Sequence, residues 1–343
     1  MRPFHNYQEL LKAVEARGHR TRVLGYAPDR SPIVAVKVGG TKKPAIFISA
    51  GSHATEQAGV TAAVELMDRL QTEHEVYIVP VRDPIGLNGY RYALSLSLGY
   101  EPQVRSVTEA EALLRERGEV LLDKDDTLLV VLGEYGYSNR VLYNRFPKGD
   151  PILDPLRGRR VFFPSRAEDQ EGAAPLERAY TLVVSLEGEV LHLNRFHDTP
   201  WAPSEVRCAR LLMAEIQPGL TLDLHEHGGD AYWMSARHQR NDEDEKWEQE
   251  MAGEAVRAVT DSGSRIVDES YSPGSFFRKL QPGVFWLEAA VRGEGLNLVD
   301  YAAHTYGPAF TVETGMRLPF EERAQTSMRV AQAAIRVFGQ RYA

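Results

Sequence analysis

The chain has 343 residues, a hydrophobic fraction of 43%, a charged fraction of 26% and a formal net charge of −8. This length allows one large α/β domain with insertions or two to three domains of roughly 100–200 residues, and the composition excludes a coiled coil, a collagen-like repeat and a disordered chain. The acidic excess opposes binding to nucleic acid because phosphate groups repel it, and the single cysteine, Cys208, excludes an internal disulfide and cysteine-based metal sites.

No apolar run approaches the roughly 18 residues that a membrane span needs, and the first ten residues lack the charged-then-apolar layout of a secretory signal. We therefore expect no membrane partner and a cytoplasmic protein. Any metal ion must bind through His, Asp or Glu side chains.

The first third of the chain follows a strand-helix-strand rhythm. The hydrophobic spacing predicts helices at residues 7–18 and 55–71, and strands at residues 33–38, 44–51 and 75–81. A turn-rich segment, DPIGLNGY, comes next. The pattern favours parallel pairing of the strands on either side of the second helix.

The rhythm loosens between about residues 93 and 190, where Gly, Pro and charged residues separate short strand candidates, and we interpret this range as an insertion. Beyond it the spacing again predicts alternating helices and strands, at residues 204–216, 219–225, 308–315 and 322–338. The prediction is one domain spanning residues 1–343: a three-layer α/β/α sandwich with a mixed, largely parallel central sheet and an inserted subdomain that walls the active-site cleft.

Candidate metal ligands follow the strand at residues 44–51. His53 and Glu56 lie three positions apart where this strand gives way to a helix, and ligands of open α/β sheets gather beyond the carboxyl ends of strands. A helical offset of three lets the imidazole and the carboxylate point the same way, which suits Zn²⁺. The H-x-x-E motif is weak by itself, so its position carries the argument.

A second buried strand ends in histidine at His225, and His227 close by is a rival ligand. Asp223 and Glu226 are candidates to orient the imidazole ring. A third strand presents Glu313 before a turn, where a carboxylate beside a metal-bound water can act as general base, with a plain salt bridge as the competing interpretation.

These segments together resemble the zinc carboxypeptidase family, including its aspartoacylase and succinylglutamate desuccinylase branch. The similar segments occur in family order and cover about 200 residues. They are PAIFISAGSHATEQAG, VPVRDPIGLNGYR, LNRFHDTPWAPSEVRCARLL, LDLHEHG and FTVETG. The resemblance departs at Asp83, where the family has asparagine, and at the family's late tyrosine, for which Arg292, Tyr301 and Tyr306 give no clear match.

The resemblance implies one Zn²⁺ ion and assigns a role to each matching residue. His53, Glu56 and His225 would be the zinc ligands, and Glu313 the general base and acid. Asn194 and Arg195 match the pair that holds a substrate carboxylate, a role that a guanidinium and an amide suit physically. The arginine that stabilises the oxyanion is expected at Arg91, with Arg140 and Arg145 as substitutes.

The implied activity is hydrolysis of an amide bond, with a metallocarboxypeptidase as the first candidate because a docked carboxylate brings the last amide of a peptide to the metal. The alternative is a deacylase or amidase acting on N-acyl amino acids or cell-wall peptides. Either enzyme takes a substrate with a free carboxylate. A third reading, an inactive binding module, has no support in the sequence because all ligands and the glutamate are present.

Overall fold

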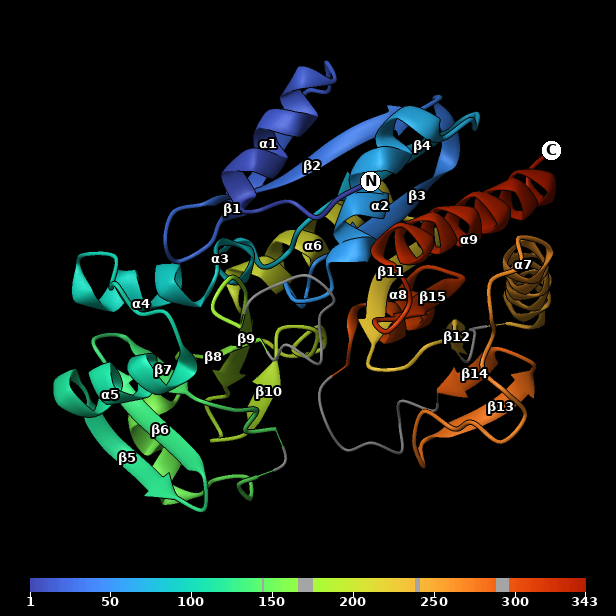
Figure 1. Ribbon diagram of the computed structural model, residues 1–343. Coiled ribbons are helices and arrows are strands. Elements are labelled where there is room, and N and C mark those ends of the chain that lie inside the picture. The colour runs from blue at the N-terminus through green and yellow to red at the C-terminus, as the bar shows by residue number, and fades with distance from the viewer. Residues whose placement is uncertain (144, 166–174, 238–240, 288–295) are drawn as a thin grey trace.

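The computed structural model describes residues 1–143, 145–165, 175–237, 241–287 and 296–343 (Figure 1). A nine-stranded sheet forms the centre of the described chain, in the order β1-β2-β4-β3-β11-β15-β12-β14-β13. Its strands are β1 (Thr21–Tyr26), β2 (Pro32–Gly39), β3 (Lys42–Ala50), β4 (His74–Val79), β11 (Leu220–His227), β12 (Trp233–Arg237), β13 (Phe277–Gln281), β14 (Val284–Leu287) and β15 (Ala309–Gly315).

Helices cover both faces of this sheet (Figure 1). One face packs against α1 (Tyr7–Ala16), α2 (Gln57–Arg69), α7 (Asp242–Asp261) and α9 (Phe320–Arg341). The other face packs against α6 (Ser204–Ile216) and α8 (Leu298–Thr305). The three-layer α/β/α architecture is therefore as the sequence predicts.

Parallel pairing is concentrated in the middle of the sheet. Strands β4, β3, β11 and β15 run parallel to one another, whereas β1, β2 and β13 pair antiparallel toward the edges. The parallel strands are apolar along most of their length because helices cover them on both sides. Every residue of β11 from Leu220 to Glu226 is buried, so the polar side chains in this strand need partners inside the protein.

The segment DPIGLNGY, expected as a turn, contains a short helix, α3 (Pro84–Asn88). Asp83 caps it: its side chain accepts a hydrogen bond from the Gly86 amide at 2.9 Å, and Pro84 occupies the first helical position. Gly89, with φ of 98°, ends it and directs the chain into α4 (Tyr90–Leu98).

Burial raises the pKa of Asp83 to about 7. Between about pH 4 and pH 7 the folded protein holds a proton that the unfolded chain has released, so this group lowers stability as the pH rises through that window. Asparagine cannot ionise, so we expect Asp83→Asn to unfold at a higher temperature than the wild type at pH 8 and to lose this advantage at pH 4. At pH 8 its free energy of unfolding should exceed that of the wild type by an amount on the order of 2 kcal/mol. Thermal unfolding at both pH values measures it.

The exposed Asp261→Asn variant is the control for the change in net charge. An Asp83→Asn variant whose melting temperature follows the wild type at both pH values would contradict the buried, protonated state of Asp83.

A second, six-stranded sheet lies within residues 119–192, in the order β10-β9-β8-β7-β6-β5. Its strands and flanking helices are α5 (Val107–Arg117), β5 (Glu119–Lys124), β6 (Thr127–Leu132), β7 (Tyr135–Ser138), the 3-10 helix η1 (Pro151–Leu156), β8 (Arg160–Pro164), β9 (Ala179–Val184) and β10 (Val190–His192). In Figure 1 this green sheet lies beside the end of β11. It brings side chains of β9 and β10 to the main sheet.

No helix among the described residues is long and apolar enough to cross a lipid bilayer.

Candidate metal centre

Three side chains from separate parts of the chain converge beyond the ends of two central strands. One ligand atom each from His53, Glu56 and His225 lies within 4.8 Å of the others, and within the described residues this is the only such cluster. Nδ1 of His53 lies 2.6 Å from one oxygen of Glu56, and Nδ1 of His225 lies 2.7 Å from the other. Two imidazoles and a carboxylate are a donor set typical of catalytic zinc, which keeps a further position for water or substrate.

The backbone after β3 sets the positions of His53 and Glu56. Gly51 has φ of 60°, and a Cβ there would lie 3.0 Å from Val60 and 3.1 Å from Val81, so a larger residue does not fit. The chain then turns into α2, which begins directly after Glu56.

Helix α2 also approaches β11 closely at Gly59. A Cβ on Gly59 would lie 2.9 Å from the carbonyl oxygen of Leu224. This contact holds the first turn of α2 against the strand residue that precedes His225, and thus keeps Glu56 beside that histidine.

The charges in the cluster depend on one another. Burial opposes ionisation of Glu56, but His53 and His225 outweigh it and bring its pKa to about 2. Burial also disfavours the charged form of His225, yet Asp223 and Glu56 raise its pKa well above the usual range. The cluster thus already accommodates one positive charge between two carboxylates, and this is the electrostatic environment that a bound cation requires.

A buried network supports His225 from the side away from Glu56. Oδ2 of Asp223 lies 2.8 Å from Nε2 of His225 and also accepts a hydrogen bond from Arg82 at 2.8 Å. Arg82 and Asp223 are 1% and 0% exposed, so this is a fully buried ion pair. Asn194 accepts a second bond from Arg82 and donates one to Asp223. A carboxylate behind a ligating imidazole fixes its orientation and tautomer.

Glu313 lies next to His225 because β15 and β11 are parallel neighbours with these two residues in register. Burial raises the pKa of Glu313 to about 8, with Glu56 and Asp223 adding to the effect and His225 opposing it. A carboxyl group with a pKa near neutrality is suited to both accepting and returning a proton.

His53, His225 and Glu313 line one cavity of about 530 Å³. Aromatic side chains from several elements form part of its wall, namely Tyr143, Trp233, Phe276 and Phe277. The cavity is large enough for a small ligand and combines apolar walls with a few convergent polar groups.

The residues expected to bind a substrate carboxylate also line this cavity, but they differ in availability. The amide of Asn194 is directed into the protein, where it bonds Arg82, Asp223 and the backbone N–H of Leu298. Arg195 is half-buried and donates to the carbonyl oxygen of Asn194. Of the two side chains, Arg195 is the more exposed.

Arg91 does not line this cavity. It lies near the start of α4 and lines a separate hollow with His5, Asn88 and Glu177. The turn at Gly89 directs α4 away from the metal cluster, and this placement argues against the oxyanion role expected for Arg91. Neither substitute lines the cavity, since Arg140 lies in another hollow and Arg145 donates to Thr127. Among the described arginines, Arg195 and Arg237 line it.

The structure also shows the positions of His227 and Glu226, the two residues of β11 that were considered beside His225. His227 contacts the carbonyl oxygen of Ala231 through Nε2 and lies outside the metal cluster, which favours His225 as the ligand. Glu226 was expected to orient the imidazole ring of His225. It instead accepts hydrogen bonds from the backbone amide of Ala58 in α2 and from the side chain of Arg323 in α9. Side chains alternate along a strand, so Glu226 points away from His225.

The second sheet contributes residues that the sequence analysis did not identify. The ring of Tyr180 on β9 stacks on His53 with centroids 4.8 Å apart. His192 at the end of β10 places Nδ1 2.8 Å from Nε2 of His53. Burial lowers the pKa of His192 well below its usual range, and Arg195 lowers it further. The sequence signal for His192 is its position two residues before Asn194.

Neither Tyr301 nor Tyr306 matches the late tyrosine of the zinc carboxypeptidase family. Tyr301 and Tyr306 pack with α6 and α8 in the core and do not line the cavity, while Arg292 lies outside the described residues. Tyr143, from the segment after β7, is the tyrosine that lines it.

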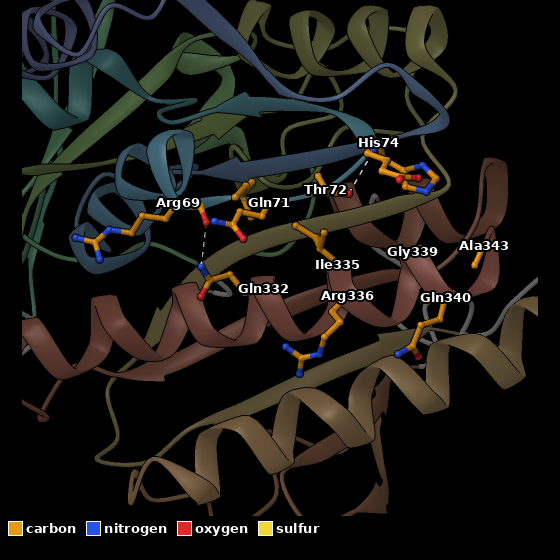
Figure 2. Close-up of a pocket in the computed structure, with 12 residues that line it drawn as sticks. Arg69, Gln71, Thr72, His74, Gln332, Ile335, Arg336, Gly339, Gln340 and Ala343 are labelled. Carbon is orange, nitrogen blue, oxygen red and sulfur yellow. Dashed lines mark hydrogen bonds between the residues drawn. The ribbon is translucent and has the colours of Figure 1, made fainter.

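Another hollow, with a volume of about 680 Å³, lies away from the metal cluster (Figure 2). It is formed by the end of α2, the start of β4 at His74 and the last turns of α9. Because β4 and β3 are parallel, the start of β4 lies at the opposite edge of the sheet from the metal cluster. It contains no metal-ligating cluster among the described residues.

Comparison with solved structures identifies the same fold in metallo-carboxypeptidases. A metallo-carboxypeptidase from Burkholderia cenocepacia superposes with a TM-score of 0.54, 12% identity, and coverage of 99% of this chain and 70% of its own. One from Pseudomonas aeruginosa, in complex with (2-guanidinoethylmercapto)succinic acid, gives a TM-score of 0.54, 13% identity, and coverage of 98% and 69%. No family model matches the chain, and no curated protein sequence is detectably similar to it.

The chain therefore has the metallo-carboxypeptidase fold. The sequence resemblance to the zinc carboxypeptidase family is confirmed at this level, and a buried His-Glu-His cluster is present at the carboxyl ends of the central strands.

Proposed function

We propose that the protein is a zinc-dependent hydrolase of amide bonds, a metallocarboxypeptidase that removes the C-terminal residue of a peptide. The observation that carries the proposal is the position of Glu313 on the strand next to that of His225, in a cavity that is also lined by His53 and His225 of the metal cluster. A proton acceptor beside a cation-binding group of this kind is the arrangement that metal-assisted hydrolysis needs.

When bound by these three side chains, zinc supplies a Lewis acid and a water of lowered pKa. Glu313 takes the proton of the attacking water and returns it to the leaving amine. Its carboxyl group lines the same cavity as His53 and His225, which places it within reach of a water bound there. Asp223 holds the ring of His225 while Arg82 and Asn194 hold Asp223.

Arg195 binds the free carboxylate of the substrate in this proposal. Its guanidinium lines the same cavity as Glu313 and can present two parallel N–H groups to a carboxylate. The backbone carbonyl oxygen of Asn194 accepts a hydrogen bond from the Arg195 guanidinium and helps to hold it in place. A docked carboxylate limits the amide bonds that reach the metal to the last one, which favours an exopeptidase.

A deacylase or amidase remains the alternative, because an N-acyl amino acid also ends in a free carboxylate that Arg195 can bind. The same metal centre serves both reactions. The difference lies on the amino side of the scissile bond, where a peptidase accepts an unblocked peptide and a deacylase accepts an acyl group.

The test measures metal content and then activity. Protein purified without chelators should contain about one zinc per chain by mass spectrometry of the metal. The protein is then incubated with free peptides, the same peptides amidated at the C-terminus, and N-acyl amino acids, each with and without a chelator. We expect release of the C-terminal amino acid from free peptides only, loss of activity with chelator, and recovery on adding zinc.

Cleavage of acyl amino acids alone would favour the deacylase. Zinc far below one equivalent, with no hydrolysis after zinc is added, would favour an inactive binding module. Equal cleavage of amidated and free peptides would contradict the role of Arg195.

A further inference from the structure

His192 makes a contact with the metal centre that the proposed zinc chemistry does not yet explain. It ends strand β10 of the second sheet, and its Nδ1 lies 2.8 Å from Nε2 of His53. It is not one of the three clustered residues, yet its ring lines the same cavity. Tyr143 packs beside it, with ring centroids 5.5 Å apart.

The two nitrogens of His53 face different partners. Nδ1 points to Glu56, and Nε2 points to His192, at 2.6 Å and 2.8 Å. If Nδ1 holds a metal ion, the proton of the neutral ring must be on Nε2. Within the described residues, His192 is the only hydrogen-bond partner of that Nε2–H.

The hydrogen bond therefore determines the tautomer of His192 as well. Nδ1 of His192 must be the acceptor, so the proton of its neutral ring lies on Nε2. The His192 ring is held by its hydrogen bond with His53 and by its packing against Tyr143.

We propose that His192 is a positioning residue for the metal ligand His53: its Nδ1 accepts the Nε2–H of His53, fixes the tautomer in which Nδ1 of His53 faces the metal, and holds the ring in that orientation. This inference rests on the proposed zinc site. It assigns the second sheet a part in metal binding, because β10 supplies the acceptor at the edge of the His53 ring and β9 supplies Tyr180, which stacks on a face of that ring.

The acceptor at this position is an imidazole and carries no charge. The two ligating histidines are therefore supported differently, since His225 faces the carboxylate of Asp223. A carboxylate partner increases the basicity of a ligating imidazole, whereas a neutral acceptor orients it with little change of charge at the metal.

Three variants of His192 separate an acceptor at Nδ1 from a merely structural role. Asn places an oxygen close to the position of Nδ1 and keeps the acceptor, whereas Gln places its amide near the position of Nε2, and Ala removes both. Zinc affinity is measured by competition with a chromophoric chelator, and the absorption spectrum of the cobalt-substituted protein reports the ligand geometry. Neither readout needs a substrate.

We expect His192→Ala and His192→Gln to bind zinc about 10- to 100-fold more weakly than the wild type, and His192→Asn to recover most of the loss. A fourth variant, His192→Asp, should bind zinc at least as tightly as the wild type, because a carboxylate partner increases the basicity of the ligating imidazole. His19→Asn is the control, since His19 contacts Asp68 on the surface and should leave zinc affinity unchanged.

Wild-type affinity in the Ala variant, or an Asn variant as weak as Ala with the same melting temperature as the wild type, would overturn the inference. The proposed function fails in a different way, through a wild-type protein that binds no zinc. If the wild type and His192→Ala bind zinc equally well, only the role of His192 is contradicted and the proposed function stands.

Discussion

Glu313→Gln is expected to lower kcat by about 10²- to 10⁴-fold on the substrate that the wild type cleaves, while one zinc remains bound. Glutamine has nearly the same shape but cannot take a proton from water. Glu313 lies outside the His53-Glu56-His225 cluster, so the metal keeps its protein ligands. Steady-state kinetics and the zinc content of the same preparation check both parts.

Glu321→Gln, on the exposed start of α9, is the matched control and should retain full activity and zinc. A Glu313→Gln protein with more than about a tenth of wild-type kcat would contradict the assignment of Glu313 as general base. Loss of zinc in this variant would instead make Glu313 part of the metal-binding set.

Arg82→Met is expected to lower the free energy of unfolding by about 3–5 kcal/mol, because it removes the guanidinium that pairs with buried Asp223 and leaves His225 as the remaining charged partner of that carboxylate. The pair is nearly inaccessible to solvent and Arg82 also bonds Asn194, so water cannot replace the lost contacts. Denaturant unfolding of the two proteins measures the difference. The loss of unfolding free energy caused by Arg82→Met should be smaller in a protein that already carries Asp223→Asn, because position 223 is then uncharged.

Arg336→Met provides the comparison for a surface ion pair. Arg336 contacts Glu254 at 2.6 Å, but its side chain is 56% exposed, so its removal should cost less than about 1 kcal/mol. If Arg82→Met is no more destabilising than Arg336→Met, then the Arg82–Asp223 pair does not stabilise the fold as the geometry indicates.

The sequence was most informative about residues at the ends of buried strands. His53, His225 and Glu313 each follow or end an apolar run, and the carboxyl ends of parallel strands meet at one edge of a sheet. Their convergence could be predicted because strand order and burial are encoded locally by hydrophobic periodicity. The helices at residues 204–216 and 322–338 could be predicted for the same reason.

The sequence was least informative about contacts between distant segments. Arg82 lies directly before a turn-rich segment and gave no sign of pairing with Asp223, which lies 141 residues later. Arg91 occupied a suitable place in its motif, yet the backbone at Gly89 turns α4 away from the cavity. Strands β12, β13 and β14 are short and were missed, because their pairing with β15 and one another outweighs a weak local pattern.

Hydrophobic periodicity thus determined the layered α/β architecture and the edge of the sheet at which polar side chains collect, since both follow from which residues must leave water. Tertiary structure alone decided which side chains meet there: whether His225 or His227 faces the cluster, which arginines line the cavity, and that β10 places His192 against His53. These choices depend on distances between segments more than 100 residues apart, and no local pattern specifies such distances.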